Sequence, residues 1–152
     1  MTDIHLEAEI HADAEAVFDA IVDLRGYDHW LPVSKAFPGI SEISPGPVGA
    51  GTTYVESGPR GVRHGTITEF ERPTRVTFRQ RMTMRPGLLG VIGIESTYSL
   101  VPSGDSTRVR RVVRVTLGWP LKLVRPLVLR QFRQEGRRTM LALQLACEQP
   151  RR

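Results

Sequence analysis

Alternating apolar and polar residues open the chain. The apolar positions are Ile4, Leu6, Ala8 and Ile10, with charged residues or histidine between them, and this period of two predicts a strand over 3–11 with one buried face. A run interrupted by proline and glycine at 35–43 is typical of an edge or bulged strand. The complete set of predicted strands is 3–11, 35–43, 52–57, 62–71, 75–84, 91–101 and 107–117.

Helical periodicity lies at the two ends of this run of strands. Asp13 suits an N-cap and Glu15 suits the first turn of a helix over 13–24, which we expect to end at Gly26. A short turn is expected at 27–31. Residues 120–148 predict a long amphipathic helix, with a kink or a restart at Pro126.

The order of these elements predicts an α+β fold. Seven antiparallel strands would form a curved sheet wrapped around the long C-terminal helix, with an internal cavity between sheet and helix. The length of 152 residues suits a single domain over 1–152. The sequence indicates the fold and its cavity far better than it indicates the ligand.

The amino-acid composition indicates a soluble protein and argues against membrane and metal-binding proteins. The hydrophobic fraction of 40% and charged fraction of 24% are those of a soluble protein, and no apolar run or basic leader suggests a membrane span or a signal peptide. We therefore expect a cytoplasmic protein. Cys147 is the sole cysteine, and the four histidines are scattered, so no metal site and no cofactor are expected.

The net charge of +5 invites a comparison with nucleic-acid-binding proteins. Lys35 and Lys122 are the only lysines. The arginines alternate with valines in strands or face away from the apolar side of the last helix, and they are not interleaved with stacking aromatics. This pattern argues against a nucleic-acid partner. Arginine in place of lysine, together with abundant alanine, glycine and proline, is typical of a GC-rich bacterial genome.

Three stretches of the chain resemble one superfamily. They are IHADAEAVFDAIVDLRGYDHW (10–30), GTITEFERPTRVTFRQ (65–80) and QFRQEGRRTMLALQLACE (131–148). Together they resemble the polyketide cyclase/START-like (SRPBCC) superfamily over residues 3–148. The resemblance implies a helix-grip fold, a seven-stranded sheet around the C-terminal helix, and a cavity for apolar ligands. The superfamily shares no catalytic signature, so the resemblance implies no catalytic residue.

Polar residues on inner faces are the candidates for chemistry. Strand alternation places Arg111 inward with Val113, and helical spacing places Glu135 beside Phe132. An isolated buried charge is costly, so we expect Arg111 and Glu135 to pair directly or through water. A bulge near Arg111 is the alternative, since it would turn that side chain outward. Tyr98 would present a hydroxyl to a ligand or would fill the core.

The inner faces give a set of predicted ligand-binding residues. They are Phe78, Gln80, Met82, Tyr98, Arg111, Val113, Phe132, Glu135 and Thr139. The leading hypothesis is a module that binds or transports a small hydrophobic or amphipathic ligand, such as a lipid, a polyketide or an isoprenoid-like molecule. The alternative is an aromatase/cyclase-like enzyme acting on a polyketide or related carbonyl compound, with Arg111, Glu135 and Tyr98 to move protons. A third class is an interaction domain with a filled core.

Two apolar segments predict the mouth of the cavity. Leu88 and Leu89 follow Pro86 and Gly87, and the start of the last helix carries Trp119 and several leucines beside Lys122 and arginines. Apolar side chains flanked by cations suit a transient contact with a membrane surface. In the alternative, the two segments pack on each other as a lid. The sequence does not set the oligomeric state.

Overall fold

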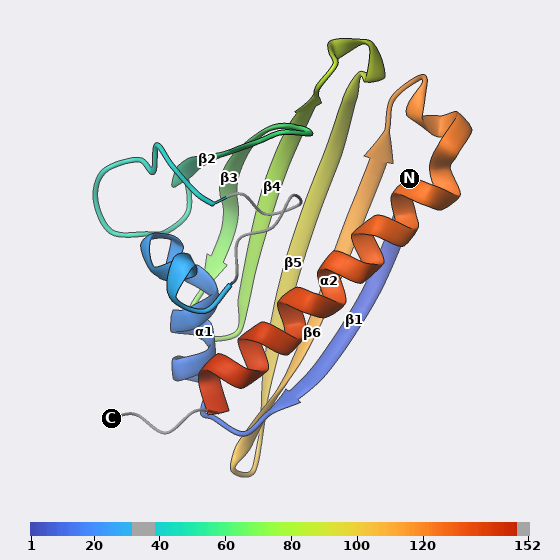
Figure 1. Ribbon diagram of the computed structural model, residues 1–152. Helices are drawn as coiled ribbons and strands as arrows, with labels where there is room; N and C mark the ends of the chain where they lie inside the picture. Colours follow the sequence, from blue (N-terminus) through green and yellow to red (C-terminus); the bar gives the residue numbers. More distant parts are fainter. Residues whose placement is uncertain (32–38, 149–152) are drawn as a thin grey trace.

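The computed structural model describes residues 1–31 and 39–148, and its architecture is an antiparallel sheet crossed by one long helix (Figure 1). The described strands are β1 (Thr2–Ile10), β2 (Thr53–Gly58), β3 (Gly61–Glu71), β4 (Arg75–Met84), β5 (Val91–Ser103) and β6 (Ser106–Leu117). The helices are α1 (Ala14–Val22) and α2 (Arg125–Glu148), with the short 3-10 helices η1 (Leu24–His29), η2 (Gly87–Leu89) and η3 (Leu121–Val124). The α+β class is confirmed.

The described strands form one sheet in the order β1-β6-β5-β4-β3-β2, with every neighbouring pair antiparallel. The sequence predicts seven strands, and the described residues form six. Of the predicted strand at 35–43, residues 35–38 lie outside the described residues, and Ser41 makes a single bridge to Val55. Gly39 and Glu42 have positive φ values of 114° and 49°, which extended strand backbone does not adopt.

The N-terminal helix begins where its capping residue predicts. The Asp13 carboxylate accepts a hydrogen bond from the Ala16 backbone N–H at 2.7 Å, and Glu15 lies in the first turn. The predicted end at Gly26 is wrong, because Asp23 accepts a hydrogen bond from the Gly26 N–H at 3.2 Å and begins η1. This cap turns the chain out of α1 three residues early.

The C-terminal segment restarts at its proline, as predicted. The 3-10 helix η3 ends at Val124, and Pro126 lies in the first turn of α2, where its missing N–H costs no hydrogen bond. Gly136 brings α2 close to β1: a Cβ atom there would lie 2.6 Å from Leu6 Cδ1. The buried side of α2 consists of Leu129, Gly136, Met140 and Leu143.

The apolar core divides into two clusters. One surrounds Phe18 and Ile67 beneath α1, and the other surrounds Ile4 and Val115 beneath the start of α2. None of the helices in the described part of the chain is long and apolar enough to cross a membrane.

Candidate functional site

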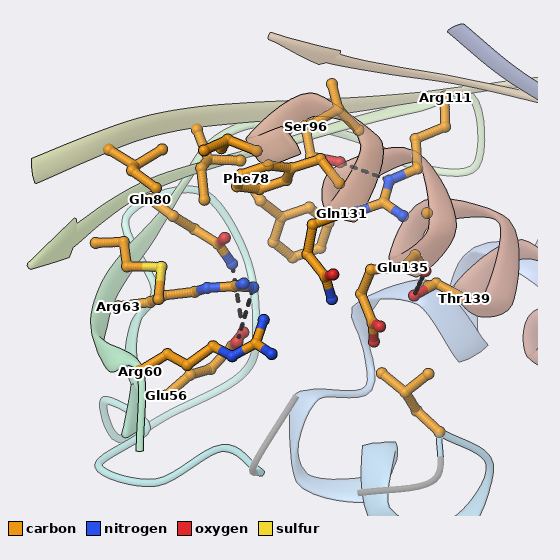
Figure 2. Close-up of a pocket in the computed structure, with 18 of the residues that line it drawn as sticks. Glu56, Arg60, Arg63, Phe78, Gln80, Ser96, Arg111, Gln131, Glu135 and Thr139 are labelled. Carbon is orange, nitrogen blue, oxygen red and sulfur yellow. Dashed lines mark hydrogen bonds and ion pairs between the residues drawn. The ribbon is translucent and has the colours of Figure 1, made fainter. Parts of the chain in front are cut away.

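A cavity of about 340 Å³ lies between the inner face of the sheet and α2. Its apolar wall draws on both core clusters, with Phe78 and Tyr98 from one and Met82, Ile94 and Val113 from the other. Polar side chains enter from β2, β3, β6 and α2 (Figure 2). A mostly apolar hollow with a few polar groups is the usual form of a small-molecule site.

The predicted ligand-binding residues all line this cavity. They are Phe78, Gln80, Met82, Tyr98, Arg111, Val113, Phe132, Glu135 and Thr139. Strand alternation on β4, β5 and β6 and the helical spacing of α2 therefore identified the inner surface. Contact of these residues with a ligand stays a prediction.

Arg111 points into the cavity (Figure 2). Its strand stays in continuous register, with Arg111 opposite Leu6 on β1 and opposite Tyr98 on β5, so no bulge turns the side chain outward. The Nε–H group donates to Ser96 Oγ at 2.8 Å, and the guanidinium carbon lies 5.0 Å from the centre of the Tyr98 ring. The Nη1 atom is buried and has no hydrogen-bond partner among the described residues.

Arg111 and Glu135 are predicted to pair directly or through water; the direct pair is wrong, and the pair through water stays a prediction. Glu135 instead accepts from Arg138 Nη2 at 2.9 Å, three residues further along α2. Residues three apart are neighbours on a helix surface, so Glu135 finds a cation without crossing the cavity. Arg111 consequently keeps its remaining donors for another group.

Sequence reasoning missed a second polar group on the opposite side of the cavity. The Glu56 side chain is only 5% exposed. Gln80 Nε2 donates to Tyr54 Oη at 2.8 Å and to Glu56 Oε1 at 3.3 Å, while Arg63 Nη1 lies 3.5 Å from Glu56 Oε2. Tyr54 and Glu56 alternate on β2, and that alternation is the signal that would have placed both of them inward with Gln80.

Burial sets the acid–base behaviour of this group. Desolvation raises the pKa of Glu56 above its ordinary 4.5, and the cations Arg63 and Arg111 and the hydrogen bond from Gln80 oppose the rise. Burial also raises the pKa of Tyr54 and of Tyr98. The two tyrosine hydroxyls thus keep their protons at neutral pH and are able to donate a hydrogen bond.

We expect Glu56→Gln to stabilise the protein increasingly as the pH rises from below 4.5 toward neutrality. A raised native pKa contributes stability that is present below the unfolded-state pKa and is lost as the pH rises through the native value. The amide keeps the shape and removes this titration. Thermal unfolding of both proteins across that pH range measures the difference. The outward-facing Glu95→Gln is the control, and a pH-independent difference for Glu56→Gln would contradict the prediction.

The mouth of the cavity carries exposed apolar side chains. Leu127 lines the cavity yet is 66% exposed, and the neighbouring Leu88, Trp119 and Leu123 are 87%, 71% and 69% exposed. Leu89 alone of the two predicted tip leucines packs with the cluster that contains Leu121. The alternative, in which the two segments pack on each other as a lid, holds for Leu89 only, because the other side chains named here remain in solvent.

The two mouth segments are neighbours nonetheless. The Gly118 N–H donates to Val91 O at 3.3 Å, and a Cβ atom on Gly90 would lie 3.0 Å from the Trp119 carbonyl oxygen. Figure 1 shows η2 and η3 at the same end of the sheet. Within the described ranges, no group of three or more histidine, cysteine, aspartate or glutamate side chains is arranged to hold a metal ion.

Solved structures share this fold at low sequence identity. Norcoclaurine synthase from Thalictrum flavum, in complex with dopamine and hydroxybenzaldehyde, is 19% identical with a TM-score of 0.71, and the match covers 99% of this chain and 89% of that one. The Aha1 dimer from Colwellia psychrerythraea is 18% identical with a TM-score of 0.67, covering 97% of both chains. Protein CV1439 from Chromobacterium violaceum is 17% identical with a TM-score of 0.66, covering 97% of this chain and 98% of that one.

These likenesses establish the fold and leave the activity open. No curated protein sequence matches the chain. The model of one family, described as polyketide cyclase / dehydrase and lipid transport, matches residues 1–148. On that match, together with the helix, sheet and cavity described above, the chain belongs to the polyketide cyclase/dehydrase and lipid transport family.

Proposed function

We propose that the protein binds a small amphipathic molecule, of the lipid, polyketide or isoprenoid-like class, in its internal cavity. The observation that carries this proposal is Arg111, whose side chain lines the apolar hollow and whose buried Nη1 donor has no partner among the described residues. A buried cationic donor left unpaired is costly. A carboxylate or carbonyl oxygen of a ligand would satisfy it while the apolar body fills the hollow.

The cavity volume argues against an interaction domain with a filled core. About 340 Å³ lies within the range of ordinary ligand sites. The family description includes both cyclases and lipid transport, and the norcoclaurine synthase structure was determined in complex with two small ring compounds. These support a ligand of modest size.

Native mass spectrometry of protein purified from its own host tests the proposal most directly. We expect a co-purified molecule with an apolar body and an acidic or carbonyl end, bound one to each cavity. The matched control is the same preparation of Arg111→Met, which should lose that molecule. Identical ligand-free masses for both proteins, even after incubation with medium-chain fatty acids, would contradict the proposal.

The enzyme alternative has one observation in its favour. Glu56 supplies a buried carboxyl group, and burial raises its pKa toward the range of a general acid or base. It would take a proton from the carbon beside a ligand carbonyl while Arg111 stabilises the developing oxyanion. With 2-decanone in D₂O, this enzyme would speed deuterium incorporation beside the carbonyl, and Glu56→Gln would abolish the acceleration. Equal rates with and without protein would reject this alternative.

The mouth suits a transient contact with an anionic membrane surface. Residues 84–92 and 117–131 contain Arg85, Lys122, Arg125 and Arg130 and neither aspartate nor glutamate. The exposed Leu88, Trp119 and Leu123 project among these cations. Apolar side chains enter the headgroup region while each nearby cation adds about 1 kcal/mol on an anionic surface. Such contact would let an apolar ligand pass between membrane and cavity without crossing water.

We expect the wild-type protein to bind phosphatidylcholine vesicles that contain phosphatidylglycerol, and to release them as salt is raised. Replacing Leu88 and Leu123 together by aspartate should weaken binding at least about tenfold, since it removes apolar contact and adds like charge. Co-sedimentation measures this. The control replaces Leu141 and Leu145, equally large exposed leucines of α2 away from the mouth. Equal losses in both variants would count against a docking role for the mouth.

A further inference from the structure

The Glu56 carboxylate has hydrogen-bonding capacity that the protein leaves unused. Each of its oxygens has one polar contact among the described residues, Gln80 Nε2 at 3.3 Å and Arg63 Nη1 at 3.5 Å. Both contacts are long for charge-assisted hydrogen bonds, and an ionised carboxylate accepts about four. Because the group is almost fully buried, bulk water does not supply the remainder.

A second unused group lies beside it. Tyr54 Oη accepts from Gln80 Nε2 at 2.8 Å, and its own hydroxyl hydrogen has no acceptor among the described hydrogen bonds. The same Gln80 nitrogen serves both Tyr54 and Glu56, so the phenol oxygen and the carboxylate oxygen lie side by side. One wall of the cavity therefore offers a donor and an acceptor together. Figure 2 shows Glu56 and Gln80 on this wall.

The charges around this pair select the kind of ligand group. Arg60, Arg63 and Arg111 all line the cavity, and their positive field disfavours an ammonium group beside Glu56. A neutral hydroxyl accepts from Tyr54 and donates to Glu56. It also suits the carboxyl group in either protonation state, because a hydroxyl accepts as readily as it donates.

We propose that Glu56 and Tyr54 form a second binding subsite that takes a hydroxyl group of the ligand. This inference rests on the proposed function, in which the acidic or carbonyl end of the ligand binds Arg111. It adds that the other end of the same ligand carries a hydroxyl group. The ligand class is thereby a molecule with an oxygen acceptor at one end, an apolar middle and a hydroxyl at the other end. Phe78, Ile94 and Val113 supply the apolar wall.

Two series of probes test the subsite. One is the unbranched fatty acids of about six to twelve carbons, whose volumes suit a cavity of this class, and the other is the ω-hydroxy acids of the same lengths. Without a partner, a terminal hydroxyl weakens binding in an apolar cavity. We expect calorimetry on the wild-type protein to show that the best-fitting ω-hydroxy acid binds at least as tightly as its unsubstituted partner. In Glu56→Met the hydroxy acid should bind about tenfold more weakly than the unsubstituted acid.

Further variants separate recognition from damage to the fold. Tyr54→Phe removes one hydroxyl from the same pair and should reduce the preference without removing the ring. Glu56→Gln retains an acceptor and should keep most of the preference, while the outward-facing Glu95→Met should leave it unchanged. Hydroxy acids that bind more weakly than plain acids to the wild-type protein, or a preference that survives Glu56→Met and Tyr54→Phe, would overturn the subsite.

Octan-1-ol keeps this test independent of the Arg111 end. Its only polar group is a hydroxyl, so it should bind Glu56→Met about tenfold more weakly than it binds the wild-type protein and Arg111→Met. If neither acid series binds but the alcohol shows this difference, the acidic-end requirement fails and the subsite stands. If acids bind through Arg111 and the alcohol binds all three proteins alike, the subsite fails and the proposed function stands.

Discussion

Arg111→Met is expected to lower the affinity for a medium-chain fatty acid about 10- to 100-fold. Hydrogen bonds to charged groups are worth about 1.5–3 kcal/mol. Arg111 lines the cavity, and its buried Nη1 donor has no hydrogen-bond partner among the described residues. Methionine keeps the length and apolar stem of the side chain while removing the donor. Calorimetric titration with decanoate measures the loss.

The same substitution is expected to leave the ligand-free protein as stable as the wild type, or more stable by about 1 kcal/mol. It removes an unsatisfied buried donor and places an apolar side chain on an apolar wall, and these gains offset the lost hydrogen bond to Ser96 Oγ. Arg110→Met is the matched control, because Arg110 is the adjacent residue of β6 and faces solvent. A fall in stability with unchanged affinity would mean that Arg111 serves the fold and not the ligand.

The inner face of the sheet was predictable because strand alternation is a local property. Arg111 alternates with Val113 and Val109 on β6, and the register continues without a bulge into β1 and β5. The partner of Arg111 was not predictable in the same way. Arg138 competes with Arg111 for the Glu135 carboxylate, and Arg138 forms the ion pair because it lies three residues further along the same helix.

The second polar group escaped prediction for a different reason. Tyr54 and Glu56 share one face of a strand of six residues, whose short alternation is a weaker signal than that of the longer β4, β5 and β6. A glutamate on such a strand suggests solvent, yet the structure buries Glu56, and Gln80 from β4 donates a hydrogen bond to it. The predicted strand at 35–43 fails in the opposite direction, since the left-handed backbone at Glu42 interrupts a run that composition favours.

Gly65→Ala is expected to lower the free energy of unfolding by about 2–3 kcal/mol. Gly65 lies opposite Tyr54 in the antiparallel pair of β2 and β3, and a Cβ atom there would lie 2.2 Å from Tyr54 Cζ. The ring is buried, makes an edge contact with Phe78 and accepts the hydrogen bond from Gln80. Overpacking of this kind typically costs about 1–3 kcal/mol, and here a hydrogen bond is strained as well.

The expected loss of stability in Gly65→Ala comes from the clash with the Tyr54 ring, and two further variants test this cause. Gly93→Ala places a methyl group 3.5 Å from Thr116 Cβ, an ordinary contact on a neighbouring strand, so its cost measured by urea unfolding should stay within about 0.5 kcal/mol. In a Tyr54→Ala background the obstacle is gone, and Gly65→Ala should then cost no more than Gly93→Ala. A loss that persists without the ring would assign the effect to the backbone of β3. If the loss disappears in the Tyr54→Ala background, the absence of a side chain at Gly65 is what makes room for the Tyr54 ring and so positions its hydroxyl beside Glu56.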